Sequence, residues 1–144
     1  MEYCEHGELT EYIKPTEGVC WPMVKDGGEQ NLPLCHVWIE QICTAPVHLR
    51  DLAVMHRDIK PENVLIASNS RGTRVPNLSD LGLALEVQDQ TRRTYGVAGT
   101  PSYMAPEISA GLPYFCEVDV WSFSLVVYEM TTGGDVKDEH VASI

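Results

Sequence analysis

Basic residues are scarce in this sequence. Its 144 residues include 10 Lys and Arg against 21 Asp and Glu, which gives a formal net charge of -11 at pH 7. Because nucleic acids and anionic membranes attract positive charge, this balance argues against either of them as the main partner. An acidic surface can favour basic peptide ligands, or it can simply keep the protein soluble.

Long apolar runs and paired cysteines are also missing. No apolar stretch approaches the roughly 18 to 20 residues that a membrane-spanning helix needs, and because the first residues do not resemble a signal peptide, no secretory leader is expected. The five cysteines are scattered and include no CxxC pair: Cys4, Cys20, Cys35, Cys43 and Cys116. Neither a zinc site nor a disulfide framework is therefore indicated, and we expect a cytoplasmic protein. The apolar content of 44% is sufficient for a globular core.

The segment 55–66 holds polar groups between two short apolar runs, a pattern that predicts strand, loop, strand. Pro61 limits the backbone freedom of the loop. Asp58, Lys60 and Asn63 supply a carboxylate, a cation and a neutral oxygen ligand within a few residues. This combination suits phosphoryl transfer: the carboxylate accepts the proton of an attacking hydroxyl, the cation neutralises phosphoryl charge, and the amide oxygen with a second carboxylate can hold Mg²⁺.

The second carboxylate follows at Asp80, in the tripeptide Asp80-Leu81-Gly82. His56-Arg57-Asp58 precedes this tripeptide and Ala105-Pro106-Glu107 follows it, so the chain carries three ordered motifs. On these motifs the chain resembles the eukaryotic protein kinases. Lys60, placed two residues after Asp58, is similar to the pattern of the serine/threonine type.

The resemblance implies an α+β fold, namely the large C-terminal lobe of a protein kinase, mostly helical with a small β-hairpin. The small lobe is expected to be absent, because no glycine-rich phosphate loop and no ATP-orienting strand lysine precede Met1. The whole chain, 1–144, is then a partial kinase domain. Its expected parts are a hinge at 1–7, a helix-loop-helix at 8–54, the catalytic loop at 55–66, the activation segment at 80–107 and a buried helix at 117–132.

The resemblance also implies ATP and Mg²⁺ as cofactors. Asp58 would be the catalytic base, Lys60 would contact the γ-phosphate, and Asn63 and Asp80 would hold the metal. The backbone of the hinge would bind adenine, Glu8 would contact the ribose, and Leu65 would form the floor under adenine. The full set of expected cofactor-binding residues is Glu2, Tyr3, Cys4, Glu8, Lys60, Glu62, Asn63, Leu65 and Asp80.

Apolar periodicity and turn residues predict the main elements. Leu34 to Asp51 has helical spacing, but Pro46 predicts a kink or an early break near residues 42 to 46. Leu9 to Ile13 is expected to continue a helix up to Lys14-Pro15, and Thr16 to Pro33 is predicted to be a loop.

Further along the chain, Val64-Leu65-Ile66 is expected to form a hairpin with Val75 to Leu78, where Pro76 favours an edge strand. Glu117 to Thr132 is apolar nearly all round, which predicts a buried helix.

Several contacts are implied by the resemblance. Thr100 is expected to hydrogen-bond toward Asp58 and Lys60, and Asp119 is expected to reach the backbone of His56-Arg57. Phosphorylation is expected among the activation-segment hydroxyls, with Arg57 as a cationic partner for the phosphate; the candidates are Thr91, Thr94 and Tyr95.

The resemblance also leads us to expect that the last helices of the large lobe are absent from this sequence, with two consequences. Glu107 would lack its arginine partner, and the helix from 117 to 132 would expose apolar surface.

The implied partners are a protein substrate with a Ser or Thr acceptor, and either the missing small lobe or a regulatory protein. No nucleic-acid or membrane partner is expected. One alternative is a truncated, inactive kinase that binds substrates or regulators without turnover. Another is a fragment of a longer reading frame with no independent role.

Overall fold

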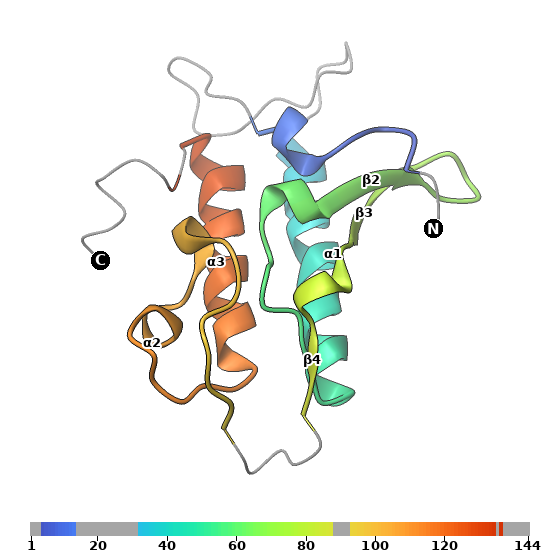
Figure 1. Ribbon diagram of the computed structural model, residues 1–144. Helices are drawn as coiled ribbons and strands as arrows, with labels where there is room; N and C mark the ends of the chain where they lie inside the picture. The colour runs from blue at the N-terminus through green and yellow to red at the C-terminus, as the bar shows by residue number, and fades with distance from the viewer. Residues whose placement is uncertain (1–3, 14–31, 88–92, 135, 137–144) are drawn as a thin grey trace.

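The computed structural model describes residues 4–13, 32–87, 93–134 and 136 (Figure 1). Its helices are α1 (Leu32–Asp51), α2 (Pro106–Ser109) and α3 (Glu117–Thr132), and its strands are β1 (Val54–Met55), β2 (Val64–Ser68), β3 (Arg74–Leu78) and β4 (Leu85–Glu86). Four short 3-10 helices are η1 (Leu9–Glu11), η2 (Pro61–Asn63), η3 (Leu81–Leu83) and η4 (Pro101–Tyr103). The expectation of helices with a small β-hairpin is confirmed.

The long helices α1 and α3 stand side by side, and the small sheets lie next to α1 (Figure 1). Two apolar clusters fill the described interior. The first contains Trp38, Ile42, Ile59 and Val126, and the second contains Met55 together with apolar residues from the later part of the chain, between Val87 and Val118. Because Met55 and Ile59 belong to different clusters, the loop between them is anchored at both ends.

Helix α1 is continuous through Pro46, so the predicted break near residues 42 to 46 is wrong. Proline removes the backbone donor to the carbonyl of Ile42 and costs a helix about 3 kcal/mol. The buried side chains of Trp38 and Ile42 hold the helix against the first cluster. The hydroxyl of Thr44 also donates to the carbonyl of Gln41 at 2.6 Å, one residue before Ile42. Tertiary packing therefore outweighs the local penalty.

The predicted hairpin is confirmed in β2 and β3, which pair antiparallel with Leu65 opposite Asn77 and Ile66 opposite Pro76. The sheet has two strands, so Pro76 lies in an edge strand as expected. Asn69 closes the turn, because its side-chain oxygen accepts from the backbone N–H groups of Arg71 at 2.9 Å and Thr73 at 3.0 Å. The other small sheet pairs β1 with β4.

The N-terminal segment lies alongside β2 and is hydrogen-bonded to it, but it forms less helix than predicted. His6 N–H donates to the Ile66 carbonyl at 3.2 Å, and Ile66 N–H donates to the Gly7 carbonyl at 2.9 Å. The expected helix from Leu9 to Ile13 is a single 3-10 turn, η1. The predicted loop from Thr16 to Pro33 lies almost entirely outside the described residues.

Helix α3 has the predicted bounds, but its burial is one-sided. Val120 is 63% exposed, and Trp121 and Tyr128 are each 39% exposed. The prediction of a helix buried all round is therefore wrong, whereas the expectation of exposed apolar surface on this helix is confirmed. Gly133 ends α3 in the left-handed conformation, at φ 68°. Among the described residues, no helix has the length and apolarity that a bilayer crossing demands.

Trp38 provides a test of the first cluster. Its side chain is 1% exposed, its ring meets that of Tyr12 edge-on at 5.2 Å, and its indole N–H donates to the Arg74 carbonyl at 3.3 Å. We expect Trp38→Ala to lower the free energy of unfolding by about 3 to 5 kcal/mol. Chemical denaturation measures this, with Val37→Ala as the control because Val37 is 41% exposed on the same helix. Equal losses in the two variants would contradict this packing.

Candidate active site

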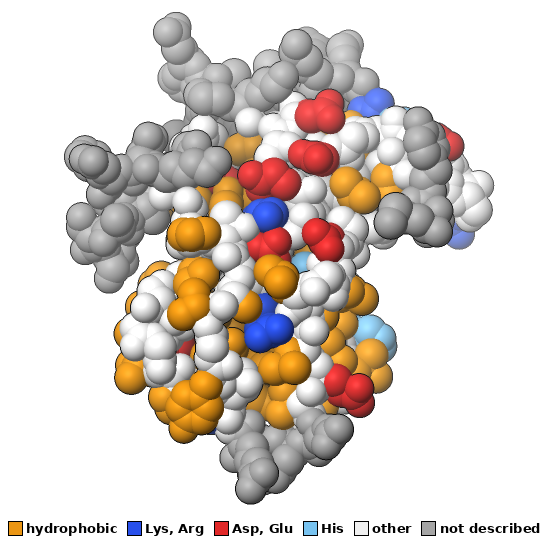
Figure 2. Space-filling view, viewed as in Figure 1, with side chains coloured by type: hydrophobic (Ala, Val, Ile, Leu, Met, Phe, Trp, Pro, Cys, Tyr) orange, Lys and Arg blue, Asp and Glu red, His pale blue; other side chains and the backbone are white. Residues whose placement is uncertain are grey.

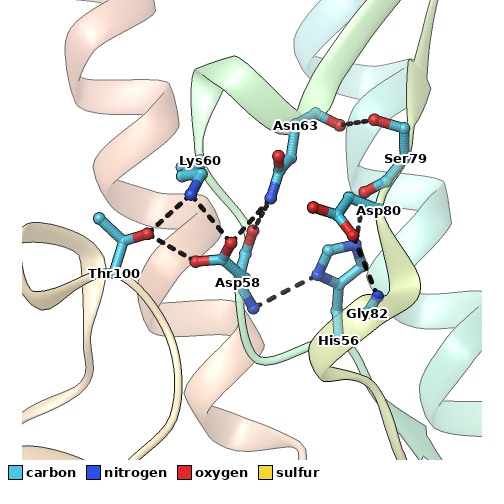
Figure 3. A network of polar contacts seen from close by, with 8 residues as sticks. All are labelled: His56, Asp58, Lys60, Asn63, Ser79, Asp80, Gly82 and Thr100. Atoms are coloured by element: carbon cyan, nitrogen blue, oxygen red, sulfur yellow. Dashed lines mark hydrogen bonds and ion pairs between the residues drawn. The ribbon is translucent and has the colours of Figure 1, made fainter.

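The side chains of Asp58, Lys60 and Thr100 form a closed ring of polar contacts (Figure 3). The Lys60 ammonium lies 2.9 Å from Asp58 Oδ2 and donates to Thr100 Oγ1 at 2.8 Å. The Thr100 hydroxyl in turn donates to Asp58 Oδ1 at 2.7 Å. The expected contacts of Thr100 with Asp58 and Lys60 are thus confirmed. The ring joins the loop between β1 and η2 to the segment just before η4, which is 40 residues further along the chain.

Asn63 supports the ring from the other side. Its side-chain N–H₂ donates to the Asp58 carbonyl at 2.8 Å and to Asp58 Oδ2 at 3.0 Å. Both partners are acceptors, which fixes the nitrogen of the amide on Asp58 and leaves the amide oxygen as a ligand. The backbone carbonyl of Asn63 accepts from Ser79 N–H at 2.8 Å and from the Ser79 hydroxyl at 2.9 Å. These bonds tie η2 to the residue before Asp80.

Asp80 lies across from Asn63 (Figure 3). Its backbone is left-handed, at φ 62°, and its Oδ1 accepts from Gly82 N–H at 3.1 Å. One carboxylate oxygen is therefore left for another partner, as is the amide oxygen of Asn63. Carboxylate and amide oxygens are the hard ligands that Mg²⁺ prefers. The donor set thus fits a magnesium ion, with water and phosphate oxygens completing its coordination.

The surroundings of Asp58 favour its ionised form. Burial acts to raise the pKa of this carboxyl, but the hydrogen bond from Thr100, the hydrogen bond and charge of Lys60, and the hydrogen bond from Asn63 outweigh it. The pKa is lowered from its ordinary value. Asp58 is therefore a carboxylate at neutral pH, the state in which it can accept a proton.

Asp119, near the start of α3, holds the backbone of the loop that carries Asp58. Its two carboxylate oxygens accept from His56 N–H at 2.7 Å and from Arg57 N–H at 2.8 Å, so the predicted brace is confirmed. Burial raises the pKa of this carboxyl despite these bonds. Arg57 has a left-handed backbone at φ 67°, a conformation unusual outside glycine. The two hydrogen bonds from Asp119 offset the energetic cost of this backbone conformation.

His56 has a role that the sequence reasoning missed. The ring is fully buried, with Nε2 3.0 Å from the Ser79 carbonyl oxygen and Nδ1 3.3 Å from the Asp58 backbone nitrogen. A carbonyl only accepts and an N–H only donates, so the ring is the neutral tautomer that carries its proton on Nε2. It links the loop to the strand end that precedes Asp80. The sequence signal that could have revealed this role is the position of His56 in the motif His56-Arg57-Asp58.

Two residues of α3 secure the chain that follows Thr100. The Tyr103 hydroxyl lies 3.0 Å from both carboxylate oxygens of the buried Glu129, and the Ser122 hydroxyl donates to the Tyr103 carbonyl at 2.8 Å. Neither contact was predicted, because apolar periodicity does not indicate which polar residues of a helix face inward. Glu107 is half-buried, and no ion pair of its carboxylate is found within the described part of the chain.

The expected cofactor-binding residues near the N-terminus are only partly described. Glu2 and Tyr3 lie outside the described residues, and Cys4 is half-buried. The backbones of Glu8 and Leu65 form an isolated antiparallel bridge, which brings these two expected contacts together. Glu8 is exposed and its carboxylate accepts from the Thr10 hydroxyl at 3.1 Å.

Glu62, in η2, was also expected among the cofactor-binding residues. Its side chain is half-buried, and its buried Oε2 has no hydrogen-bond partner among the residues that the structure describes.

The candidate phosphorylation sites differ in their surroundings. Thr91 lies outside the described residues, Thr94 forms a backbone bridge with Tyr114, and Tyr95 is 68% exposed. The Arg57 guanidinium donates from Nε to the Leu83 carbonyl at 2.8 Å. It therefore contacts the start of the activation segment.

An ionised aspartate that is hydrogen-bonded by a lysine, a threonine and an asparagine, with a second aspartate nearby, is an arrangement that suits phosphoryl transfer. The family model described as "Protein kinase domain" matches residues 1–142. The chain belongs to the protein kinase family, in its serine/threonine branch.

Two curated relatives illustrate the similarity. Serine/threonine-protein kinase Nek5 of Mus musculus is 35% identical over 132 residues, covering 92% of this chain and 19% of that protein. Calcium/calmodulin-dependent protein kinase type II alpha chain of Drosophila melanogaster is 42% identical over 95 residues, covering 66% of this chain and 18% of that protein. The chain thus spans about a fifth of the length of these relatives.

The brace formed by Asp119 can be tested by substitution. Asp119→Ala leaves the backbone N–H groups of His56 and Arg57 without acceptors, each at a cost of about 1 to 3 kcal/mol. We expect the free energy of unfolding to fall by about 2 to 5 kcal/mol in denaturant titrations. Val120→Ala, at the exposed neighbouring position, should change it by less than about 0.5 kcal/mol. A loss no larger than that of the control would show that water replaces the carboxylate.

Gly99 offers a second test, of the contact that seats Thr100. Its φ is 110°, and a Cβ atom would lie 2.3 Å from the Arg57 carbonyl oxygen. We expect Gly99→Ala to destabilise the protein by about 2 kcal/mol more than Gly111→Ala. Gly111 is a matched control because it also has positive φ, 67°, but has open space around it. Thermal unfolding of the two variants measures the difference, and equal shifts would assign the effect to φ alone.

Proposed function

We propose that the protein transfers the γ-phosphoryl group of ATP to Ser or Thr hydroxyls of protein substrates. The observation that carries this proposal is the ring of Asp58, Lys60 and Thr100 with Asn63 and Asp80 beside it (Figure 3). Membership of the kinase family supports it. In this proposal residues 1–144 are the large lobe of the kinase domain, divided as the motifs predict.

Asp58 acts as the catalytic base. Its Oδ2 accepts from Asn63 and Lys60, whereas its Oδ1 accepts from a single described residue, Thr100. A carboxylate oxygen can accept two hydrogen bonds, so Oδ1 has capacity for the hydroxyl of a substrate. Asp58 orients that hydroxyl and takes its proton as the oxygen attacks phosphorus.

Lys60 acts on the transferred phosphoryl group. An ammonium has three donors, and the structure uses two of them, on Asp58 and Thr100. The third is free for a γ-phosphate oxygen. This geometry places a positive charge beside the base without a change of rotamer, so the charge is preorganised for the transition state.

Asn63 and Asp80 would hold Mg²⁺ through the amide oxygen and the carboxylate oxygen that remain. When bound, the metal neutralises phosphate charge and orients the phosphates of ATP. We assign the base of ATP to the backbone of residues 2–4 and to Leu65 beneath it, and the ribose to Glu8. Glu62, the neighbour of Asn63 in η2, is the last of the proposed cofactor-binding residues.

The charge around the site bears on the substrate. Figure 2 shows acidic side chains gathered over the upper part of this face, around one Lys or Arg, and hydrophobic side chains over the lower part. A negative field raises the local concentration of cationic peptides. We therefore propose protein substrates with basic residues near the acceptor, and a cytoplasmic setting for the reaction.

The segment 1–144 contains no glycine-rich phosphate loop and no motif for an ATP-orienting strand lysine. We therefore assign turnover to the whole protein and propose that this segment alone is inactive. The exposed Val120, Trp121 and Tyr128 on α3 favour a second candidate function, the binding of a regulator or substrate without turnover.

Asp58→Asn separates these two functions. The amide cannot accept the proton of a substrate hydroxyl, so kcat should fall by about 10²- to 10⁴-fold. Transfer of labelled phosphate from Mg²⁺-ATP to a basic Ser-containing peptide measures this in the full-length protein. The matched control is Asp51→Asn, at the end of α1, where the side chain is exposed and forms a surface ion pair with its neighbour Arg50.

Unchanged turnover in Asp58→Asn would remove Asp58 from the role of base. Peptide binding without turnover in the unsubstituted protein would favour the binding function.

A further inference from the structure

Tyr114 lies outside the three motifs but contacts two parts of the candidate active site. It follows α2, its side chain is 0% exposed, and its ring belongs to the second apolar cluster. The hydroxyl donates to the Gly96 carbonyl at 2.9 Å. The same oxygen accepts from Nη1 of Arg57 at 3.4 Å. One buried hydroxyl therefore connects the activation segment with the catalytic loop.

The backbone of Tyr114 reinforces this connection. Thr94 N–H donates to the Tyr114 carbonyl at 2.9 Å, and Tyr114 N–H donates to the Thr94 carbonyl at 3.0 Å. The segment from Thr94 to Gly96 is thus held by two main-chain bonds and one side-chain bond. Figure 1 shows this segment and the loop before α3 meeting beside α2.

Arg57 is held by neutral oxygens. Its guanidinium donates to the Leu83 carbonyl and to the Tyr114 hydroxyl, and within the described ranges it forms no ion pair with a carboxylate. A half-buried cation with neutral partners depends on the placing of those partners. The Tyr114 hydroxyl is suited to this role because it accepts from Arg57 while donating to Gly96.

The position of Arg57 determines the position of Thr100. The backbone of Gly99 approaches the Arg57 carbonyl so closely that a Cβ atom would lie 2.3 Å from it. Thr100 is the next residue, and its hydroxyl bonds Asp58 at 2.7 Å. A shift of Arg57 or of residues 96–99 therefore displaces Thr100 from the ring.

We propose that the Tyr114 hydroxyl is a positioning group for phosphoryl transfer, which holds Thr100 on Asp58 by fixing Gly96 and Arg57. This inference rests on the proposed function. The ring of Tyr114 fills the second cluster, as a phenylalanine ring would. The positioning role belongs to the hydroxyl alone, so Tyr114→Phe separates it from packing.

The experiment is a double-mutant cycle in the full-length protein. Tyr114→Phe should lower kcat by roughly tenfold, the factor that corresponds to one hydrogen bond, with the KM for ATP changed less than about twofold. Thr100→Ala should lower kcat by at least as much. Because the two groups act through one contact, the double variant should match Thr100→Ala alone. Ser124→Ala is the control, because it removes an exposed hydroxyl of α3 that donates only locally, to the Trp121 carbonyl at 2.7 Å, and it should leave kcat unchanged.

Three outcomes would overturn the inference: a wild-type kcat in Tyr114→Phe, multiplication of the two effects, or a loss that only follows lowered thermal stability. If Tyr114→Phe does not fold, Arg57→Lys removes the Nη1 donor from the other side and should show the same non-additivity with Thr100→Ala. Full turnover in Asp58→Asn would instead overturn the proposed function. Loss of turnover in Asp58→Asn with normal turnover in Tyr114→Phe would overturn this inference alone.

Discussion

The carboxylate of Asp119 holds the loop that follows β1 in place, and the geometry of the candidate site depends on it. It accepts the backbone N–H groups of His56 and Arg57, two consecutive residues in a loop that has little regular structure. A left-handed residue such as Arg57 is unfavourable by itself, and it persists only where its surroundings fix it. The two apolar clusters hold the loop ends through Met55 and Ile59, and Asp119 fixes the polar backbone between them.

Once Arg57 is fixed, the later part of the chain can be placed on it. Gly99 packs against the Arg57 carbonyl, which only a residue without a Cβ can do. Thr100 then reaches Asp58 and Lys60, and Tyr103 is held by Glu129 and by Ser122 of α3. Helix α3 thus supports both sides of the site, the loop that carries Asp58 and the segment that carries Thr100. Their relative position is set by one rigid element.

Sequence reasoning succeeded where residues act through local spacing or through a motif. The hairpin of β2 and β3, the bounds of α3, the ring around Asp58 and the brace by Asp119 were all predicted. Sequence reasoning failed where tertiary contacts determine the local structure. Pro46 stays inside α1 because the packing of the buried Trp38 and Ile42 outweighs the cost of a proline within a helix.

The contacts of His56 and Tyr114 join residues 23 and 57 positions apart in the chain, which no periodicity reveals. Such contacts become visible only once the fold has brought the segments together.

The polar residues of α3 show why hydrophobicity alone mispredicted this helix. Asp119, Ser122 and Glu129 are buried, while the apolar Val120, Trp121 and Tyr128 are exposed. The three polar residues repeat at helical spacing and share the inward face with Val126 and Met130.

Each of these buried groups has partners. Asp119 binds two N–H groups, Ser122 donates to a carbonyl, and Glu129 accepts from the Tyr103 hydroxyl and from Val136 N–H at 3.0 Å. Rotating α3 by one residue would leave all three groups unpaired, at about 1 to 3 kcal/mol each. An apolar helix face tolerates such rotation far better, since apolar contacts are not directional. The polar face therefore fixes the register of α3, and through it the distance between Asp58 and Thr100.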